Sequence, residues 1–445
     1  MIKLIVATSG IALILPSCSN HVREASELSP QKFAKHRSNQ SWWRQLNDNS
    51  INQDVSAALA NSPSLKVIEL RSKQAEAAVA AARATTLPRI NLGFGYQEGR
   101  RREVNSEPYD LAPWQSQSGI SWEIDLTGKL KAAKNAAVEN HNASIWDIAS
   151  ARQLLASRIA NVRMNLYRLN AEITTLGLLQ RNQGGTIENL SAQSQAGLIP
   201  DSTLFAQRAE GENLKRRKQD LMMLRDITVV QLRSLRGGTT PKNISSAQFP
   251  SPRYLPSQQL DKLISSHPSI LAAEARVRAA FQLQHSAKLD LLPSFQINLL
   301  AQGGQRSLAD RFRTWTVKAG PSLNIPIYDP ARIANLDSKK AKAKIQAQKY
   351  KEVVLKVLEE IDIARIKLIS RRAQFTTLDR EIAALSKSKK NALDQLNAGV
   401  ISKNEYLIVE RNWLNATLKR SALHQSVLSA HIELIRATGG GPIAR

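Results

Sequence analysis

The residue best suited to covalent chemistry in this 445-residue chain is its only cysteine, Cys18. A single thiol cannot form a disulfide within one chain. Cys18 follows a short basic start, residues 1–3, and a largely apolar stretch, residues 4–15. Together these two segments have the layout of a secretory signal. The sequence therefore predicts a signal peptide over residues 1–17 and a reactive thiol beside its cleavage site.

The residues around this thiol indicate the modification. Leu15-Pro16-Ser17-Cys18 resembles a bacterial lipobox, in which the cysteine is acylated and becomes the first mature residue. Pro16 departs from the residues usual at its position, and an ordinary signal peptide with an unmodified cysteine is the alternative. Ser19 stands where an aspartate would imply retention in the inner membrane. The resemblance therefore implies a palmitate-bearing lipoprotein of the outer membrane, with residues 18–41 as a polar tether behind the acyl anchor.

No other set of side chains in the sequence has the spacing of a catalytic site. We find no Ser/His/Asp, metal-ligand or nucleotide-binding pattern. Gly439-Gly440-Gly441 follows a helical pattern and not a strand, so it indicates a helix stop and not a phosphate loop. We expect no enzyme, no cofactor and no bound metal.

The formal net charge is +25. Such a charge would suit a solvated helical surface, an anionic membrane surface or a nucleic acid. Acidic residues are interspersed with the basic ones and no nucleic-acid-binding motif accompanies them, so we expect no nucleic-acid partner.

The element that organises the chain is a long helical hairpin from Gly128 to about Leu235. Apolar residues recur along its first helix at steps of four and three, the a and d pattern of a coiled-coil seam: Leu155, Ile159, Val162, Leu166, Leu169, Ile173 and Leu176. A tight turn at Ala196-Gly197-Leu198 reverses the chain. The arm from Gly128 to Gly197 has about 69 residues, so it would be on the order of 100 Å long.

A second copy of this arrangement follows about 205 residues later. Before the first hairpin, alternating residues predict two strands: Ile90, Leu92, Phe94 and Tyr96, then Ile120, Trp122, Ile124 and Leu126. Before the second hairpin the matching residues are Phe295, Ile297, Leu299 and Ala301, then Trp315, Val317 and Ala319, continuing through Leu323, Ile325 and Ile327. The second arm runs from Pro330 to a turn at Ala398-Gly399 and has the same length. The chain is therefore a duplication of one unit, in which two strands precede a long hairpin.

The four predicted strands cannot make a closed sheet alone. Each has an apolar face, and the opposite faces carry Arg89, Asn91, Gln97, Glu123, Gln296, Asn298 and Asn324. This alternation suits tilted membrane strands with lipid outside and water inside. Four strands enclose no useful interior, and unpaired edges are not tolerated in lipid. We therefore expect several chains to pool their strands into one barrel and their hairpins into one tube.

Taken together, these residues resemble the outer-membrane efflux protein family, the TolC-like factors, and particularly its NodT-type lipoprotein branch. The resemblance covers nearly the whole mature chain. It rests on these segments in order: Trp42-Trp43, Ala58-Leu59-Ala60-Asn61-Ser62-Pro63, Leu87-Pro88-Arg89-Ile90-Asn91-Leu92, Trp122-Glu123-Ile124-Asp125-Leu126-Thr127-Gly128-Lys129, Ala196-Gly197-Leu198-Ile199, Ile325-Pro326-Ile327-Tyr328-Asp329 and Ala437-Thr438-Gly439-Gly440-Gly441. His267-Pro268-Ser269 departs from the Arg-Pro-Asp common in this branch, and residues 442–445 replace an aromatic soon after the glycines.

The resemblance implies a fold that is mainly α with membrane β. Three copies would form a 12-stranded β-barrel in the outer membrane, continuous with an α-helical barrel in the periplasm. The homotrimer would be the passive exit duct of a tripartite efflux system for small molecules such as drugs. Its partners would be a periplasmic adaptor (membrane fusion protein), an inner-membrane pump and outer-membrane lipid.

Other functions stay open in the sequence. The same duct could serve type I protein secretion or metal efflux. A periplasmic adaptor lipoprotein is a further alternative, although two equal hairpins, each preceded by two long strands, argue against it.

The resemblance also implies where residues act. Glu405 and Asp201 would line a closable periplasmic aperture at the hairpin tips; alternatively, both are helix N-terminal acids stabilised by the helix dipole. The adaptor would contact the tip residues Gly197, Leu198, Ile199, Gly399, Val400 and Ile401. Arg100, Arg101 and Arg102 would lie in an extracellular loop and contact lipopolysaccharide, or would simply be solvated.

The predicted division of the chain follows the duplication. It comprises the signal peptide (1–17), the tether after the lipidated cysteine (18–41), a first efflux repeat (42–236), a linker rich in Pro, Ser and Thr (237–256), a second efflux repeat (257–441) and a short tail (442–445).

Overall fold

The computed structural model describes residues 41–102, 104, 107–110, 113–250, 266–305 and 314–440. The predicted signal peptide, the predicted lipidation site Cys18 and nearly all of the tether lie outside the described residues, as do residues 251–256 of the linker and the tail.

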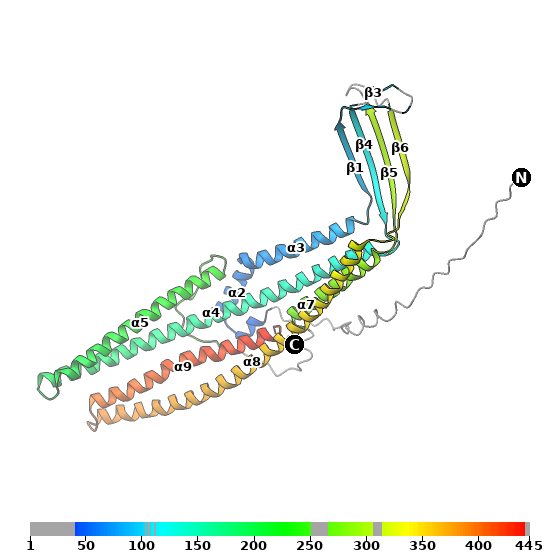
Figure 1. The fold of residues 1–445 in the computed structure, drawn as a ribbon. Helices are drawn as coiled ribbons and strands as arrows, with labels where there is room; N and C mark the ends of the chain where they lie inside the picture. The colour runs from blue at the N-terminus through cyan, green and yellow to red at the C-terminus, as the bar shows by residue number, and fades with distance from the viewer. Residues whose placement is uncertain are drawn as a thin grey trace. The chain divides into compact units, whose positions relative to one another are not determined.

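The described chain is mainly helical (Figure 1). Its helices are η1 (Trp42–Leu46), α2 (Asn49–Asn61), α3 (Pro63–Ala84), α4 (Lys129–Gln195), α5 (Asp201–Leu235), α7 (Pro268–Leu289), α8 (Pro330–Asn397) and α9 (Lys403–Ala437). The two long arms, α4 and α8, have 67 and 68 residues, which confirms the prediction of equal arms. None of the described helices contains an apolar stretch long enough to cross a bilayer.

The strands form one antiparallel four-stranded sheet in the order β1-β4-β5-β6 (Figure 1). Their bounds are β1 (Arg89–Tyr96), β4 (Trp114–Ile124), β5 (Ser294–Gln305) and β6 (Thr314–Asn324). A separate two-residue pair, β2 (Arg100–Arg101) with β3 (Tyr109–Asp110), lies in the connection between β1 and β4. Each half of the chain thus supplies two adjacent strands, as the duplication predicts.

Some predicted boundaries were wrong. The last strand ends at Asn324 and not at Ile327. Pro326 cannot donate a ladder hydrogen bond, which accounts for the early end. Strand β5 extends through Gly303 and Gly304, beyond the predicted alternation that ended at Ala301. Helices α2 and α3 are separated at Ser62, whose backbone is extended before Pro63.

The same local chemistry starts the equivalent helices of the two repeats. The side chain of Ser62 caps α3 and that of His267 caps α7, each just before a proline at the first helical position. At the strand-to-arm junctions, Asp125 accepts hydrogen bonds from the first turn of α4, and Asp329 accepts them from the first turn of α8. A carboxylate therefore sets the start of each long arm.

The helices pack as one layer with two open edges. In the half nearest the sheet, α3 contacts α4, α4 contacts α7 and α7 contacts α8; beyond it, α5 contacts α4, α4 contacts α9 and α9 contacts α8. A cluster of leucines, Leu176, Leu179, Leu214 and Leu414, joins α4 to both of its hairpin neighbours. Helices α3 and α5 occupy one edge of the layer and α8 occupies the other, just as β1 and β6 are the two edges of the sheet.

The largest core lies where η1 and α2 cover α4. Trp42 and Trp43 are buried there with Ile159 and Tyr167. The coiled-coil seam predicted on α4 is confirmed, since Leu155, Ile159, Leu166, Leu169 and Leu176 are all buried. The N-terminal segment thus acts as a cover that buries the middle of the first arm.

Candidate functional site at the hairpin tips

The two hairpin tips have the same backbone geometry. At the end of α4, Gly197 has φ +68°, its N–H donates to Ser194 O, and the N–H of Leu198 donates to Gln193 O. At the end of α8, Gly399 has φ +73°, and the N–H of Val400 donates to Gln395 O. This is a Schellman C-cap, which requires the left-handed conformation that glycine adopts without strain.

The tips present apolar side chains to solvent. Leu198 is 73% exposed and Val400 is 70% exposed, while Ile199 and Ile401 are partly buried beside them. Exposed apolar residues mark a contact surface when they are grouped, as they are at each tip. The residues predicted to contact the adaptor therefore lie together on each tip.

Asp201, one of the two predicted aperture acids, begins α5. Its carboxylate accepts a hydrogen bond from Ser194 Oγ at the end of α4. The side chain closes its own tip and lies where the helix dipole stabilises a negative charge.

Glu405, the other predicted aperture acid, is part of a capping box at the start of α9. Its carboxylate accepts from Ser402 N over 2.7 Å, and Ser402 Oγ accepts from Glu405 N over 3.3 Å. The hydrogen bond from the Ser402 backbone lowers the pKa of the Glu405 carboxyl, which is fully exposed. Both acids thus also have the helix-terminal role that was the alternative in the sequence.

The structure brings the two hairpins together through a polar network that the sequence did not reveal. Asn182 of α4 donates to Leu407 O over 2.9 Å and to Glu410 Oε2 over 3.0 Å on α9. Arg411 of α9 donates back to Asn182 Oδ1 over 3.3 Å and to Thr186 Oγ1 over 3.1 Å. We refer to these five residues, Asn182, Thr186, Leu407, Glu410 and Arg411, as the cross-hairpin network.

The cross-hairpin network lies within about four turns of the tips and is largely buried. Asn182 is 4% exposed and Thr186 is 9% exposed. A hydrogen bond with a charged partner in such a site contributes about 1.5–3 kcal/mol. The only signal in the sequence was that Asn182 and Thr186 are polar residues one helical turn apart and so share a face.

A second link joins the two hairpins nearer to the tips. Lys403 Nζ, at the first residue of α9, lies 3.3 Å from Glu188 Oε2 of α4. Both side chains are more than half exposed, so the pair is weak and sensitive to salt. Together the network and this pair hold the second hairpin against the first.

The predicted loop arginines lie at the opposite end of the strands from the helices. Arg100 Nε contacts Asp110 Oδ1 over 2.8 Å within the β2–β3 pair, and Arg101 pairs with Tyr109 in register. Arg102 is exposed. Only Arg100 is therefore held by a described carboxylate.

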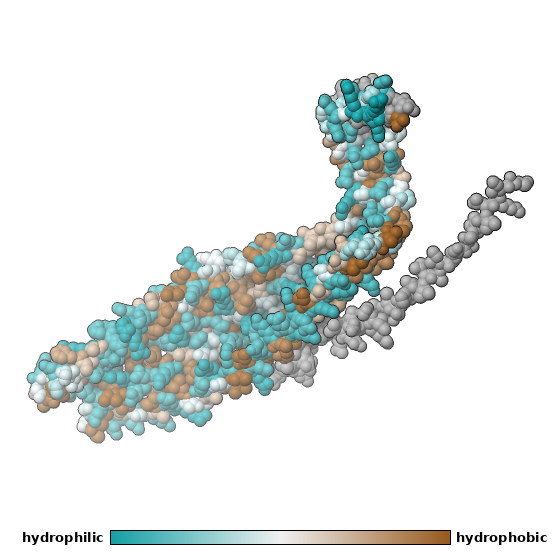
Figure 2. Space-filling model, in the orientation of Figure 1, coloured by the Kyte–Doolittle hydropathy of each residue, from teal (hydrophilic) through white to brown (hydrophobic). Residues whose placement is uncertain are grey.

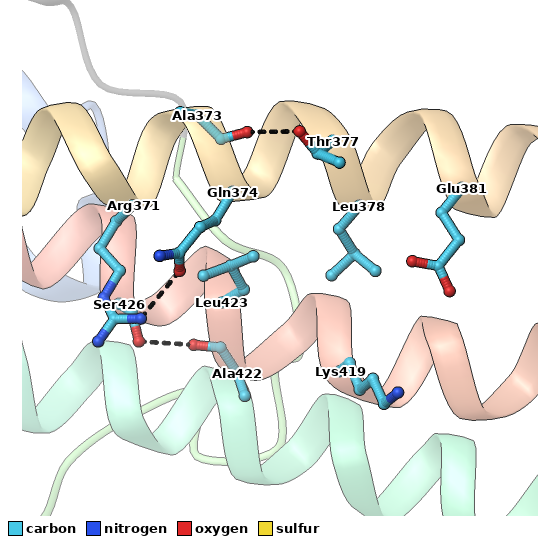
Figure 3. A pocket seen from close by; sticks show the side chains of 10 residues that line it. All are labelled: Arg371, Ala373, Gln374, Thr377, Leu378, Glu381, Lys419, Ala422, Leu423 and Ser426. Atoms are coloured by element: carbon cyan, nitrogen blue, oxygen red, sulfur yellow. Dashed lines mark hydrogen bonds between the residues drawn. The ribbon is translucent and has the colours of Figure 1, made fainter.

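A groove of about 720 Å³ lies between α8 and α9, far from both tips (Figure 3). Leu378 and Leu423 form its apolar part, and Arg371 hydrogen-bonds to Gln374 on its wall. The groove holds no nucleophile–base pair. Among the described residues, no three His, Cys, Asp or Glu side chains are placed to hold a metal ion.

Comparisons with known proteins agree with this geometry. The sequence profile of the family described as outer membrane efflux protein matches residues 55–238 and 259–440, one match in each half of the chain. The chain is 25% identical over 420 residues to the pyoverdine export outer membrane protein OpmQ of Pseudomonas putida, covering 90% of this chain and 88% of that protein. It is 24% identical over 429 residues to the putative multidrug resistance outer membrane protein MdtQ of Escherichia coli, covering 90% and 87%.

Solved structures show the same fold. The outer-membrane channel OprN matches with a TM-score of 0.80 at 20% identity, over 93% of this chain and 95% of that one. The outer membrane protein VceC of Vibrio cholerae matches with a TM-score of 0.78 at 21% identity, over 91% and 100%. The arrangement of two strand pairs and two long hairpins is thus shared with both.

Proposed function

The chain belongs to the outer membrane efflux protein family, and we propose that three copies of it form the passive exit duct of a tripartite efflux system. The duct would carry small molecules such as drugs from a periplasmic adaptor and an inner-membrane pump to the exterior. The relatives OpmQ and MdtQ, named for pyoverdine export and multidrug resistance, support a small-molecule cargo.

The observation that carries this proposal is the open sheet. Strands β1 and β6 each pair with one neighbour and leave their outer edges unpaired. In lipid, an unpaired strand edge costs several kcal/mol for each unsatisfied backbone group. Joining β1 of one copy to β6 of the next removes every edge, and three copies of four strands give a 12-stranded barrel.

The two faces of the sheet support a membrane position. One face of β1 carries Ile90, Leu92 and Phe94, which are 76%, 68% and 73% exposed in the single chain. Burying such side chains in lipid gains about 25 cal/mol per Å² of apolar surface. The opposite face is mostly amide, hydroxyl and glycine, which suits a water-filled interior.

The helical edges carry exposed apolar residues that a neighbouring copy would cover. The space-filling view shows hydrophobic side chains spread over the helical surface (Figure 2). On the α3 and α5 edge the exposed residues are Val67, Leu70, Phe205, Met222, Met223, Leu224, Ile227 and Val230. On the α8 edge they are Ile333, Ile345, Leu355, Ile363, Ile366 and Ile369. A ring that joins one edge to the other buries both sets, as a heterologous contact requires.

We assign the tips to the periplasmic end of the duct. Leu198 and Val400, with their neighbouring glycines and isoleucines, would meet the adaptor. Threefold symmetry would turn Asp201 and Glu405 into rings of carboxylates, and the cross-hairpin network would keep the aperture narrow until the adaptor engages. The arginines of the β1–β4 connection would then face the exterior, and acylated Cys18 would anchor the chain to the outer membrane.

The test of the proposal is fractionation with crosslinking. The protein should be recovered from outer membranes with detergent as a trimer. A set of cysteine pairs that combines Ile90, Leu92 or Phe94 of β1 with Trp315, Val317 or Ala319 of β6 samples the register, which the stagger of a closed barrel shifts between copies. One of these pairs should crosslink between copies, and none should crosslink within one chain. A soluble monomer without intermolecular crosslinks would exclude the duct.

A second experiment addresses the cargo. A strain that lacks the gene should become more sensitive to several small toxic compounds, and the wild-type gene should restore resistance. Sensitivity to a metal alone, or loss of a secreted protein alone, would favour the other duct functions.

A further inference from the structure

The face of the sheet opposite the apolar face, which we call the polar wall, carries few charged side chains. Arg89 is in register with Ser121 of β4 and Asn298 of β5, and this row ends at Gly320 of β6. Lys318 lies two residues from Gly320, and strand side chains alternate, so Lys318 and Arg89 share this face. Both side chains are exposed, and neither has an ion-pair partner among the described residues.

The acid on the same wall is already neutralised. Glu123 lies two residues from Ser121 and is the single carboxylate on this face of the described strands. Its Oε1 is 2.6 Å from Lys129 Nζ at the start of α4, and both side chains are about three-quarters buried. Lys129 also lies 3.3 Å from Asp290 Oδ1, which Arg332 contacts in turn. Glu123 and Asp290 are thus paired with local cations, whereas the charges of Arg89 and Lys318 are not neutralised by a nearby carboxylate of the described residues.

The rest of the wall is uncharged and open. Amides such as Asn91, Gln117 and Gln296 can hydrogen-bond to a solute of either sign. A Cβ added to Gly95 or Gly320 would meet nothing within 4 Å, so these positions leave room. The electrical character of the wall therefore comes from Arg89 and Lys318.

The two cations lie on the two edge strands. Their rows are two residues apart, which is about 7 Å along the strands. When β1 of one copy joins β6 of the next, the strand that carries Arg89 in one chain lies beside the strand that carries Lys318 in its neighbour. Two cations in each of three chains make a girdle of six in the closed barrel.

We propose that this girdle of Arg89 and Lys318 is an anion-selecting element of the duct. It raises the concentration of anionic solutes inside the barrel and makes the electrostatic barrier to their passage lower than the barrier for cations. The proposal rests on the trimeric duct proposed above. Rings of fixed Arg and Lys favour anions in pores, and a low-dielectric wall focuses their field. At physiological salt the field extends about 8 Å, so a solute must pass close to the girdle to sense it.

The test uses the full-length trimer in a planar lipid bilayer with two multivalent probes. Naphthalenetrisulfonate is the anionic probe and hexaamminecobalt(III) is the cationic probe, each added to one side at a time. From the barrel side, the anion should block the current of the wild type, and Arg89→Gln with Lys318→Gln should weaken that block by about fivefold or more. Probes added from the barrel side report on the barrel, because they reach it before the narrow tips.

Two further variants complete the test. Glu123→Gln removes a negative charge from the same wall and should strengthen the anionic block. Lys215→Gln, which removes a surface cation of α5 far from the sheet, should leave it unchanged. A wild type blocked better by the cation from the barrel side, or an anionic block that survives both substitutions, would overturn the anion preference while the duct stands. A reconstituted protein with no conductance at all would overturn both proposals.

Discussion

Arg163 of α4 donates its Nε–H to Asp54 Oδ2 of α2 over 2.7 Å, and both side chains are almost completely removed from solvent. Arg236, at the end of α5, donates to the other oxygen of the same carboxylate over 2.8 Å. Arg163 also donates to the backbone carbonyls of Lys242 and Asn243 in the segment that follows α5. One carboxylate thus ties the N-terminal cover, the first hairpin and the start of the linker together.

Replacing this carboxylate should be costly. Asp54→Asn leaves two guanidinium groups buried without their anion, and breaking a buried ion pair in this way costs about 3–5 kcal/mol. We expect a clearly lower thermal unfolding midpoint for the detergent-solubilised trimer and faster proteolysis after α5. Glu212→Gln, which removes the acid of an exposed pair with Lys215, is the control and should change little. Equal effects of the two substitutions would refute the anchoring role.

The two glycines after α5 offer a matched comparison. Gly237 has φ +70° and Gly238 has φ +91°, so alanine strains the backbone at both positions by about 1–2 kcal/mol. Only at Gly237 would the new Cβ lie 2.3 Å from Asn61 O, whereas at Gly238 nothing lies within 4 Å. Gly237→Ala should therefore lower the unfolding midpoint well beyond Gly238→Ala, and similar midpoints would contradict the close packing against α2.

Loosening the cross-hairpin network should open the periplasmic end. Asn182→Ala removes the donor to Leu407 O and Glu410 and the acceptor for Arg411. We expect a higher single-channel conductance in planar bilayers, because the second hairpin is then less firmly held. Asn415→Ala, at an exposed position of α9, should conduct like the wild type. An unchanged conductance of Asn182→Ala would mean that the network does not contribute to closure.

Two buried histidines predict a loss of stability in mild acid. Burial lowers the pKa of His267 and of His431 to about 4, with Glu360 and Arg436 near the first and Arg372 near the second. The unfolded chain binds these protons below a pKa of about 6.5, whereas the folded chain does not until about pH 4. The stability is therefore complete above about pH 6.5 and falls as the pH decreases toward 4, by on the order of 3 kcal/mol for each histidine.

The measurement is the unfolding midpoint at pH 7.5 and pH 5. His431→Gln should reduce the difference between these two midpoints. His285→Gln, at an exposed position of α7, should not. A wild type that is equally stable at both values would show that these side chains are not kept neutral by burial.

The repeating architecture follows from the amino-acid sequence alone. Apolar spacing at steps of four and three predicted the seam that the structure buries along α4. Strict alternation predicted β1 and β5 to within a few residues, and the second half of β4, which begins at Trp114 and not at Ile120. Gly197 and Gly399 predicted both tips, because a left-handed C-cap requires a residue without a Cβ. These features depend on local periodicity and backbone conformation, so neighbouring residues in the chain are sufficient to reveal them.

The tertiary structure alone decided which distant side chains meet. Nothing local to Asp54 indicates Arg163, 109 residues away, and nothing local to Asn182 indicates Leu407. Trp42 is buried because η1 and α2 fold over α4, and nothing local to Trp42 indicates these contacts. The sheet register likewise placed Arg89 and Lys318 on one wall, since pairing across β1, β4, β5 and β6 cannot be inferred from the alternation within each strand. Buried polar contacts arise from how whole elements pack, and their free energy is realised only when the packed partner excludes water.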